Sequence, residues 1–249
     1  MGEIVIPTNC IALDELLGGG LRTGTLLLAY GEAETGKTTL ALQLAINCSA
    51  IGHKALFVDC EGSLRPEKIR AMAADDPEVL ENLTIARPRS FEEQAELIEC
   101  LPDFASAGLT LVAVDTMTGL YRLKLSELVV EATEGEEGDE EARKKIREMT
   151  FALNRELNRQ AAMLAQVAHE YDVAVVMTSQ VRARPTAEED AVEPVASRIL
   201  RFWAEVVLRL RLTGRPGLRM AVLEKGPDPG LVGSMRLFKL TDEGIVDVL

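Results

Sequence analysis

The sequence predicts an α/β fold with a mostly parallel central sheet flanked by helices and an antiparallel extension at its C-terminal end. Short apolar runs, bounded by turn or charged residues, alternate with helical patterns through the first 180 residues. A glycine-rich loop lies between the first such run and the first long helical pattern. The last quarter instead alternates polar and apolar residues between glycines and prolines, which is typical of antiparallel strands with one solvated face.

Four apolar runs are the expected strands of the parallel core, because strands buried on both faces read as continuous apolar segments. They lie at 25–30 (TLLLAY), 55–60 (ALFVDC), 109–115 (LTLVAVD) and 173–180 (VAVVMTSQ). Helices are expected at 37–50, 66–74, 91–100 and 142–171. In the longest, apolar side chains recur every three or four residues, which predicts one stripe packed against the sheet.

The segments EVVLRLRLTG, LRMAVLEKG and SMRLFKL are the expected antiparallel extension. Residues 131–141 (EATEGEEGDEE) and 182–194 (RARPTAEEDAVEP) are expected to be loops. Neither a repeat nor a change in composition marks a boundary, so we expect one domain across residues 1–249.

Composition excludes several classes of protein. Hydrophobic residues make up 47% of the chain, enough for a sizeable core and too many for a disordered polypeptide. No apolar run approaches the ~18 residues of a membrane span and the N-terminus has no signal-peptide pattern, so we expect a cytoplasmic protein without membrane contact. Four scattered cysteines and two histidines argue against a zinc site or a Ser-His-Asp triad.

The charge is uneven along the chain. With 27 basic and 40 acidic residues the net charge is −13, which argues against bulk nucleic-acid binding by charge alone. Seven acidic residues fall within 131–141, whereas six arginines between Arg198 and Arg219 share that stretch with one acid, Glu205. The C-terminal region could therefore contact DNA. Alternatively, its arginines form solvated strand faces, where alternate residues such as Arg209 and Arg211 point the same way.

The most specific motif is G-x-x-x-x-G-K-[ST] at residues 31–38, between a predicted strand and a predicted helix. Backbone N–H groups of such a loop surround phosphate oxygens, and the helix N-terminus adds partial positive charge. We therefore expect ATP here, with Lys37 reaching its β- and γ-phosphates. The expected nucleotide-binding residues are Gly31, Glu32, Ala33, Glu34, Thr35, Gly36, Lys37, Thr38 and Thr39. An ordinary glycine-rich turn is the alternative. Glu34 is expected to point to solvent, because turned inward it would weaken nucleotide affinity.

Thr38 and Asp115 are the expected ligands of Mg²⁺. The Thr38 hydroxyl follows the lysine of the motif, and Asp115 ends the buried strand 109–115. A carboxylate at the carboxyl end of such a strand can hold the metal, usually through water. Alternatively, Asp115 caps the following helix.

Two more polar residues stand at expected strand ends. Glu61 follows the strand 55–60 and could orient the water that attacks the γ-phosphate. Asp59 is the competing carboxylate, although Gly62 opens space beside Glu61. Gln180 ends the strand 173–180, where its amide could bind the γ-phosphate, or it is merely a polar strand terminus. The expected catalytic residues are therefore Lys37, Glu61 and Gln180.

Together these motifs resemble the cores of archaeal RecA-type recombinases. The first 45 residues and the segments FVDCEGSLRPEKI, LTLVAVDTMTGLYR, VAVVMTSQV and LTDEGIVDVL are similar to successive parts of that core. The chain begins almost directly at the core, without the N-terminal helical domain of the full recombinase RadA. In this respect the chain resembles the short RadB-type paralogues. The resemblance implies a RecA-like P-loop ATPase core across nearly the whole chain.

The resemblance also implies roles for individual residues. Glu61, rather than Asp59, is the residue that orients the attacking water, and Arg65 lies near the adenine base. Gln180 senses the γ-phosphate and leads into a second DNA loop at 181–195. A first DNA loop would follow Tyr121. The expected DNA contacts are Arg182, Arg184, Arg198 and Arg201. The acidic residues 131–141 fall in the first loop, where they would repel a phosphate backbone, and this puts strand exchange in doubt.

What the resemblance implies for function is an ATP- and DNA-binding protein that assists homologous recombination and repair. Such a protein hydrolyses ATP weakly, uses Mg²⁺ and does not exchange strands on its own. The implied partners are DNA, with single strands preferred, RadA, a junction-processing nuclease and further copies of the chain. Two alternatives stay open: a KaiC-like ATPase that signals to protein partners, and a nucleotide-gated scaffold that regulates RadA without useful turnover.

Overall fold

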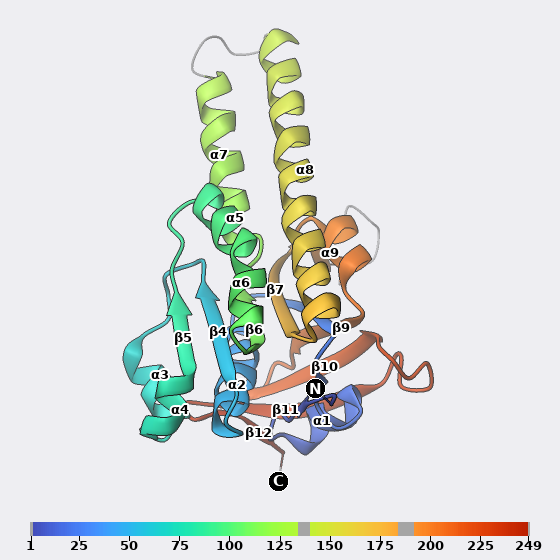
Figure 1. The fold of residues 1–249 in the computed structure, drawn as a ribbon. Helices are drawn as coiled ribbons and strands as arrows, with labels where there is room; N and C mark the ends of the chain where they lie inside the picture. Colours follow the sequence, from blue (N-terminus) through green and yellow to red (C-terminus); the bar gives the residue numbers. More distant parts are fainter. Residues whose placement is uncertain (1, 134–139, 184–191, 249) are drawn as a thin grey trace.

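A large twisted sheet runs through the protein, which is known from a computed structural model that describes residues 2–133, 140–183 and 192–248 (Figure 1). Its strands, in spatial order, are β12 (Gly244–Asp247), β11 (Met235–Thr241), β10 (Leu218–Lys225), β9 (Val206–Leu212), β3 (Leu26–Gly31), β7 (Ala174–Ala183), β6 (Leu109–Asp115), β4 (Lys54–Asp59) and β5 (Leu83–Ala86), with β8 (Val192–Pro194) beside β7. β1 (Val5–Ile6) and β2 (Leu21–Arg22) form a separate antiparallel pair.

The sheet is parallel on one side and antiparallel on the other. β9, β3, β7, β6, β4 and β5 run parallel to one another, whereas β10, β11 and β12 continue the sheet in antiparallel pairs. The predicted fold class is confirmed. The segment EVVLRLRLTG, expected as part of the antiparallel extension, contributes β9, whose pairing with β3 is parallel.

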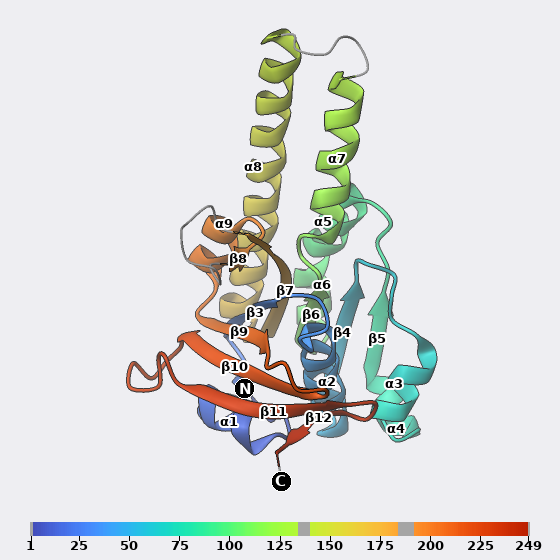
Figure 2. The ribbon, with the colours of Figure 1, turned by 180° about the vertical axis from the view of Figure 1, so that it is seen from behind.

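Helices cover both faces of the sheet (Figures 1 and 2). One face packs against α1 (Ile11–Leu17), α2 (Lys37–Ala50), α3 (Pro66–Met72) and α4 (Pro77–Asn82). The other packs against α5 (Phe91–Glu99), α6 (Leu101–Ser106), α7 (Gly119–Thr133), α8 (Glu140–Tyr171) and α9 (Ser197–Trp203). The central strands are therefore buried on both sides, which explains their continuous apolar sequences.

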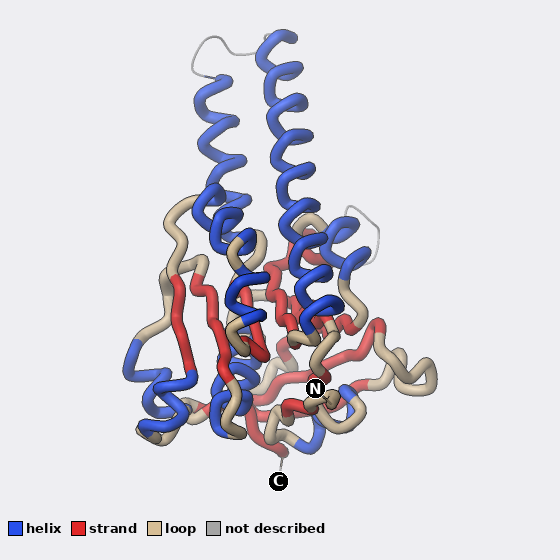
Figure 3. Tube along the Cα trace, in the orientation of Figure 1, coloured by secondary structure: helices blue, strands red, loops and turns tan. Residues whose placement is uncertain are grey.

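Two long helices, α7 and α8, project together from the body of the molecule (Figure 3). A loop was expected after Tyr121, and this expectation is wrong, because α7 continues to Thr133. The acidic segment 131–141 is also divided: its first three residues end α7, residues 140–141 begin α8, and 134–139 lie outside the described residues. Apolar side chains of both helices, including Leu125, Leu128 and Leu153, pack into the core at their base.

Hydrogen bonds connect the first and last segments of the described chain to α1 and α2. The side-chain amide of Gln43 in α2 donates to the carbonyl oxygens of Thr8 and Ile245, and its Oε1 accepts from the backbone N–H of Ile245. The Asp247 carboxylate accepts the backbone N–H groups of Ile11 and Ala12 at the start of α1. Hydrogen bonds to this otherwise unpaired helix end lower the pKa of Asp247.

Within the described part of the chain, no helix combines the length and apolarity that crossing a membrane requires.

Candidate active site

The loop between β3 and α2 folds back on itself where the sheet ends. Gly31 leaves no room for a side chain, because a Cβ there would lie 2.2 Å from the Leu210 carbonyl oxygen. Gly36 precedes α2 with a φ of 98°, a left-handed conformation that glycine adopts without steric cost. Thr35 Oγ1 donates to the Glu32 carbonyl oxygen at 2.9 Å and closes the loop. The loop therefore frames the N-terminus of α2, where backbone N–H groups are free to bind an anion.

Lys37 lies in the first turn of α2 and is buried. Its Nζ donates to the Glu32 carbonyl oxygen at 2.6 Å, so the ammonium is held against the loop. Burial lowers the pKa of Lys37, and the carboxylates of Asp115, Glu61 and Glu32 oppose this effect. A phosphate at the loop would supply a strong anionic partner to an ammonium that burial has partly stripped of water.

Ala33 and Glu34 form the exposed rim of the loop. Glu34 has a φ of 63°, in the left-handed region that is costly for a residue with a Cβ. Its carbonyl oxygen accepts a hydrogen bond from Arg219 Nε at 2.8 Å. An arginine from β10 therefore fixes the rim of a loop that is distant from it in the sequence.

A pocket of about 390 Å³ opens beside this loop. It is lined by Glu34, Gly36, Lys37, Thr38, Thr39, Lys68, Arg219 and Leu240. Three of these side chains are cationic and one is anionic. Lys68 donates from Nζ to Thr39 Oγ1 at 3.0 Å, and burial lowers the pKa of Lys68. The pocket thus offers positive charge on the loop side and on the side of the antiparallel strands.

Asp115 lies at the carboxyl end of β6 and is 1% exposed. Its Oδ1 accepts from the Thr178 hydroxyl, while its Oδ2 has no hydrogen-bond partner in the described part of the chain. Burial raises the pKa of Asp115, and the hydroxyls of Thr178 and Thr38 partly offset this effect. A buried carboxylate oxygen without a partner, near a threonine hydroxyl, fits the oxygen ligands that Mg²⁺ prefers.

Glu61 joins a set of polar side chains just after β4, just after β6 and within β7. Its Oε1 accepts from Gln180 Nε2 at 2.9 Å and from Thr116 Oγ1 at 3.2 Å. Gln180 Oε1 in turn accepts from the guanidinium of Arg122, one turn into α7. A Cβ on Gly119, the first residue of α7, would lie 3.4 Å from Glu61 Cγ, so α7 begins directly against this glutamate. The structure therefore links the glutamate to the base of the projecting helices.

Asp59, the competing carboxylate, forms hydrogen bonds and an ion pair with nearby residues. It is 1% exposed and accepts the backbone N–H groups of Ser63 and Leu64. Its Oδ2 also pairs with Arg87 Nε at 3.2 Å. These contacts hold the segment between β4 and α3, and they leave Glu61 as the exposed carboxylate at this strand end.

A family model described as Rad51 matches residues 2–248. The chain belongs to the Rad51 family. It is similar to the DNA repair and recombination protein RadB of Halobacterium salinarum, at 36% identity over 96% of this chain and 94% of that protein. The RadB protein of Thermococcus onnurineus is 33% identical over 98% of both chains. A solved structure described as the RadB recombinase superposes with a TM-score of 0.74, at 31% identity, and covers 98% of this chain and all of that one. The resemblance found in the sequence is confirmed.

The arginines predicted to contact DNA have different surroundings in this Rad51-family chain. Arg198 is exposed on α9. Arg201 is held in an ion pair with Glu224 at 2.5 Å and lies 5.9 Å from the ring centre of Tyr30, so its guanidinium serves to fasten α9 to the sheet. Arg182 lies in β7, where its backbone pairs with residue 193 of β8, and Arg184 lies outside the described residues.

Gln180 does not end its strand, which corrects the sequence prediction. β7 continues to Ala183 and pairs with β8, so both ends of the expected second DNA loop are strands. The carboxamide nevertheless reaches the residue that follows β4, because its Nε2 donates to Glu61 Oε1 at 2.9 Å.

Lys68 and Arg219 are site residues that the sequence analysis missed. Arg65, the predicted adenine neighbour, is the exposed residue before α3, whereas Lys68 of the same helix lines the pocket. Arg219 was assigned to the basic C-terminal series, and the structure places it on the loop instead. The signal for Lys68 is its position three residues after Arg65, about one helical turn.

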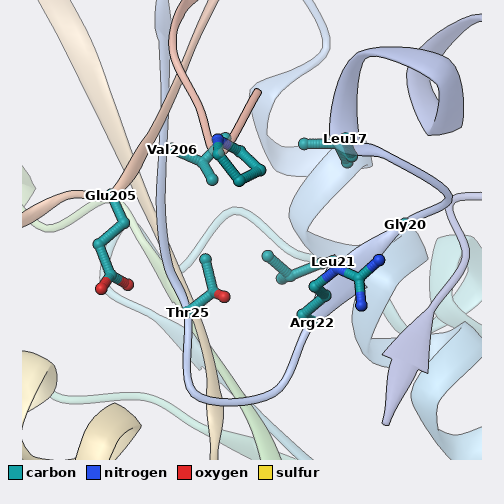
Figure 4. A pocket seen from close by; sticks show the side chains of 8 residues that line it. Leu17, Gly20, Leu21, Arg22, Thr25, Glu205 and Val206 are labelled. Atoms are coloured by element: carbon teal, nitrogen blue, oxygen red, sulfur yellow. The ribbon is translucent and has the colours of Figure 1, made fainter. Parts of the chain in front are cut away.

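A second pocket, of about 280 Å³, lies at the opposite edge of the sheet (Figure 4). It is lined by Leu17, Gly20, Leu21, Arg22, Thr25, Glu205, Val206 and Pro227. These residues surround the amino ends of β3 and β9, whereas the candidate active site lies at carboxyl ends. Among the predicted site residues that the structure describes, none lines this pocket.

Proposed function

We propose that this chain is an ATP- and DNA-binding recombinase paralogue that assists homologous recombination and DNA repair. The observation that carries the proposal is the cationic pocket at the start of α2, beside a buried carboxylate oxygen that lacks a partner. Members of the Rad51 family are ATPases, and the relatives named RadB are described as DNA repair and recombination proteins. This description favours the recombination hypothesis over a KaiC-like signalling module.

Specific residues could hold each part of the nucleotide. Backbone N–H groups of the loop, with Lys37, Lys68 and Arg219, would balance the triphosphate charge. Thr38 and Asp115 would hold Mg²⁺, which when bound offsets charge on the β- and γ-phosphates. Glu61 would orient the attacking water, and Gln180 would contact the γ-phosphate.

We further infer that hydrolysis is weak. Glu61 Oε1 accepts hydrogen bonds from both Gln180 and Thr116. These two donors occupy the carboxylate oxygen that would otherwise be free to orient the attacking water. A catalytic glutamate restrained in this way supports nucleotide binding more than rapid turnover.

We also infer that this chain does not exchange strands on its own. Where a first DNA loop was expected, α7 and α8 form a helical pair, and the sequence between them is acidic. Single-stranded DNA is the preferred nucleic acid in our proposal. RadA, a junction-processing nuclease and further copies of the chain are the proposed protein partners, and the cytoplasm is the proposed location.

Calorimetry with ATP and Mg²⁺ tests the nucleotide site. The wild-type protein should show a saturable heat of binding, and Lys37→Ala should abolish it because the remaining loop cannot balance the phosphate charge. Lys54→Ala, on an exposed lysine at the start of β4, is the matched control and should bind normally. Equal ATP affinity in Lys37→Ala and the wild type would contradict the proposal.

Turnover separates a slow ATPase from a nucleotide-gated scaffold. Phosphate release by the wild type should exceed the rate of Glu61→Gln at least tenfold, because positioned acid–base groups contribute about 10²-fold or more. If both proteins release phosphate at the same background rate while binding ATP equally, the scaffold hypothesis replaces the ATPase.

A further inference from the structure

Aromatic side chains are few in this protein, and several of them gather on one exposed surface. The sequence holds six phenylalanines, three tyrosines and one tryptophan. Phe202 is 72% exposed and Phe151 is 67% exposed, the highest values for aromatic side chains among the described residues. Phe202 stacks edge to face on Trp203, with ring centres 5.0 Å apart and an interplanar angle of 89°. Large apolar rings are unfavourable in water, so a soluble protein rarely gathers them on its surface unless that surface binds a partner.

The two exposed phenylalanines come from helices that pack side by side (Figures 1 and 2). Trp203 Nε1 donates to Asn158 Oδ1 at 3.1 Å, which fastens the end of α9 to one face of α8. Residues at spacings of three or four share a helical face, so Phe151 lies on the Asn158 face, two turns and roughly 10 Å nearer the projecting end. The surface therefore continues from α9 along α8.

Arginines occupy the same surface. Arg147 and Arg155 flank Phe151 at spacings of four on α8, and Arg198 precedes Phe202 by four residues on α9. All three are exposed, and none of them pairs with a carboxylate within the described ranges. Arg159 and Arg201, by contrast, are bound to Glu156, Glu99 and Glu224. Glu148 borders the face. The net charge of the chain is −13, whereas these unpaired arginines make this surface locally positive.

We propose that this surface, formed by Arg147, Phe151, Arg155, Arg198 and Phe202 and called here the aromatic–arginine face, binds single-stranded DNA by stacking bases on its rings. The arginines would contact the phosphates between stacked bases. Single strands fit because their bases expose both π-faces, whereas paired bases in a duplex do not. The inference rests on the proposed function, and it assigns the DNA to α8 and α9 in addition to the loops that the sequence predicted.

A protein partner is the competing occupant, because aromatic residues and arginine are also enriched in protein interfaces. Trp203, the single tryptophan, reports directly on this face through its fluorescence. We would titrate the full chain with a thymidine oligonucleotide and with an abasic oligonucleotide of equal length, which carries the same phosphates but no bases. Both titrations are run at low salt, with and without a non-hydrolysable ATP analogue.

The thymidine oligonucleotide should quench Trp203 emission and bind more tightly than the abasic one. Phe202→Leu keeps an apolar side chain but removes the ring, and it should weaken thymidine binding about fivefold or more while leaving abasic affinity within twofold. Phe202→Tyr keeps a ring and should retain wild-type affinity. Phe104→Leu, on an exposed phenylalanine of α6, is the matched control and should behave as the wild type.

Two results would overturn the inference while leaving DNA binding intact. One is equal thymidine affinity in Phe202→Leu and the wild type. The other is a change in oligomeric state of Phe202→Leu by light scattering without a change in DNA affinity, which would assign the face to a protein contact. If the wild type binds neither oligonucleotide, the DNA-binding part of the proposed function fails as well, and ATP calorimetry still reports independently on the nucleotide site.

Discussion

Asp115 combines two properties that usually exclude each other in a stable core. It is buried at the end of β6, and one of its carboxylate oxygens has no hydrogen-bond partner among the described residues. Burial of a charge without full compensation costs free energy of folding. A divalent cation bound to the carboxylate would remove that cost. Asp115 therefore favours cation binding, and it lowers the folding stability of the cation-free protein.

Replacing Asp115 with Asn should therefore stabilise the nucleotide-free protein. Burial raises the pKa of Asp115, so its contribution to stability is present below its unfolded pKa of 3.8 and is lost as pH rises through the folded value. Ionisation of Asp115 places a charge in the core with no partner for Oδ2 among the described residues, whereas Asn stays neutral and can still accept from Thr178. We expect Tm to rise by about 2–4 °C, measured by calorimetric scanning.

The same variant should lose the increase in Tm that ATP with Mg²⁺ gives the wild type. The difference between the two proteins should shrink as the pH is lowered toward 4. A lower Tm for Asp115→Asn at pH 7 would show that the carboxylate has a partner that stabilises it.

Glu34 places a carboxylate on the rim of the phosphate pocket and adopts a left-handed backbone conformation. Glu34→Gly should raise ATP affinity several-fold, because it removes a like charge and the steric cost of a Cβ at positive φ. Calorimetry at two salt concentrations checks this result. The gain should be smaller at high salt, and an unchanged affinity at low salt would mean that Glu34 points away from the phosphates.

The residues nearest the expected phosphates are predictable from the sequence because they occupy one short motif. Gly31, Gly36 and Lys37 lie where the motif requires, Asp115 is the last residue of a recognisable strand, and Glu61 follows another. Lys68 and Arg219 are not predictable in this way, because they reach the pocket through the packing of α3 and through the antiparallel strands. Nothing local in the sequence distinguishes Arg219 from the other arginines of its series.

At the scale of elements, the buried strands are the best-predicted part of the fold. β6 has the predicted bounds, and β3 and β4 are displaced by one residue. α2 also has the predicted bounds. Boundaries fail where pairing extends a strand beyond its apolar run, as β8 does for β7.

α7 was missed because its sequence, GLYRLKLSELVVEAT, spreads apolar residues around the helix. It therefore lacks the single stripe that identifies an amphipathic helix. α8 has such a stripe, and it was predicted to within two residues. The pairing of the two helices could not be read from either alone.

Deleting residues 131–141 and joining the helices by a short glycine–serine linker tests the role of the acidic segment. The deletion removes seven acidic residues and no residue of the described core. Affinity for single-stranded DNA should rise severalfold at low salt, because like charge near the phosphate backbone is removed. Tm should change by less than about 2 °C. A linker of equal length that keeps the seven acids is the control, and equal affinity of the two proteins would place the segment away from the DNA.

At the scale of the whole molecule, a net charge of −13 requires that any DNA contact be local. Binding should therefore be weak at physiological salt and steeply salt-dependent. With three to five phosphates neutralised, the slope of log affinity against log salt should be roughly −2 to −4 for a single strand. Fluorescence titrations at salt concentrations from about 20 to about 200 mM measure this slope. A slope near zero would indicate binding without phosphate contacts.

Gln43 bridges Thr8, near the start of the chain, and Ile245, near its end, across the helix that begins with Lys37. On the ribosome, the phosphate-binding helix emerges long before its last supporting strand has been made. The helix therefore lacks this contact until the strand that carries Ile245 has been made. A partly synthesised chain without that strand should bind ATP less tightly than the chain that contains it.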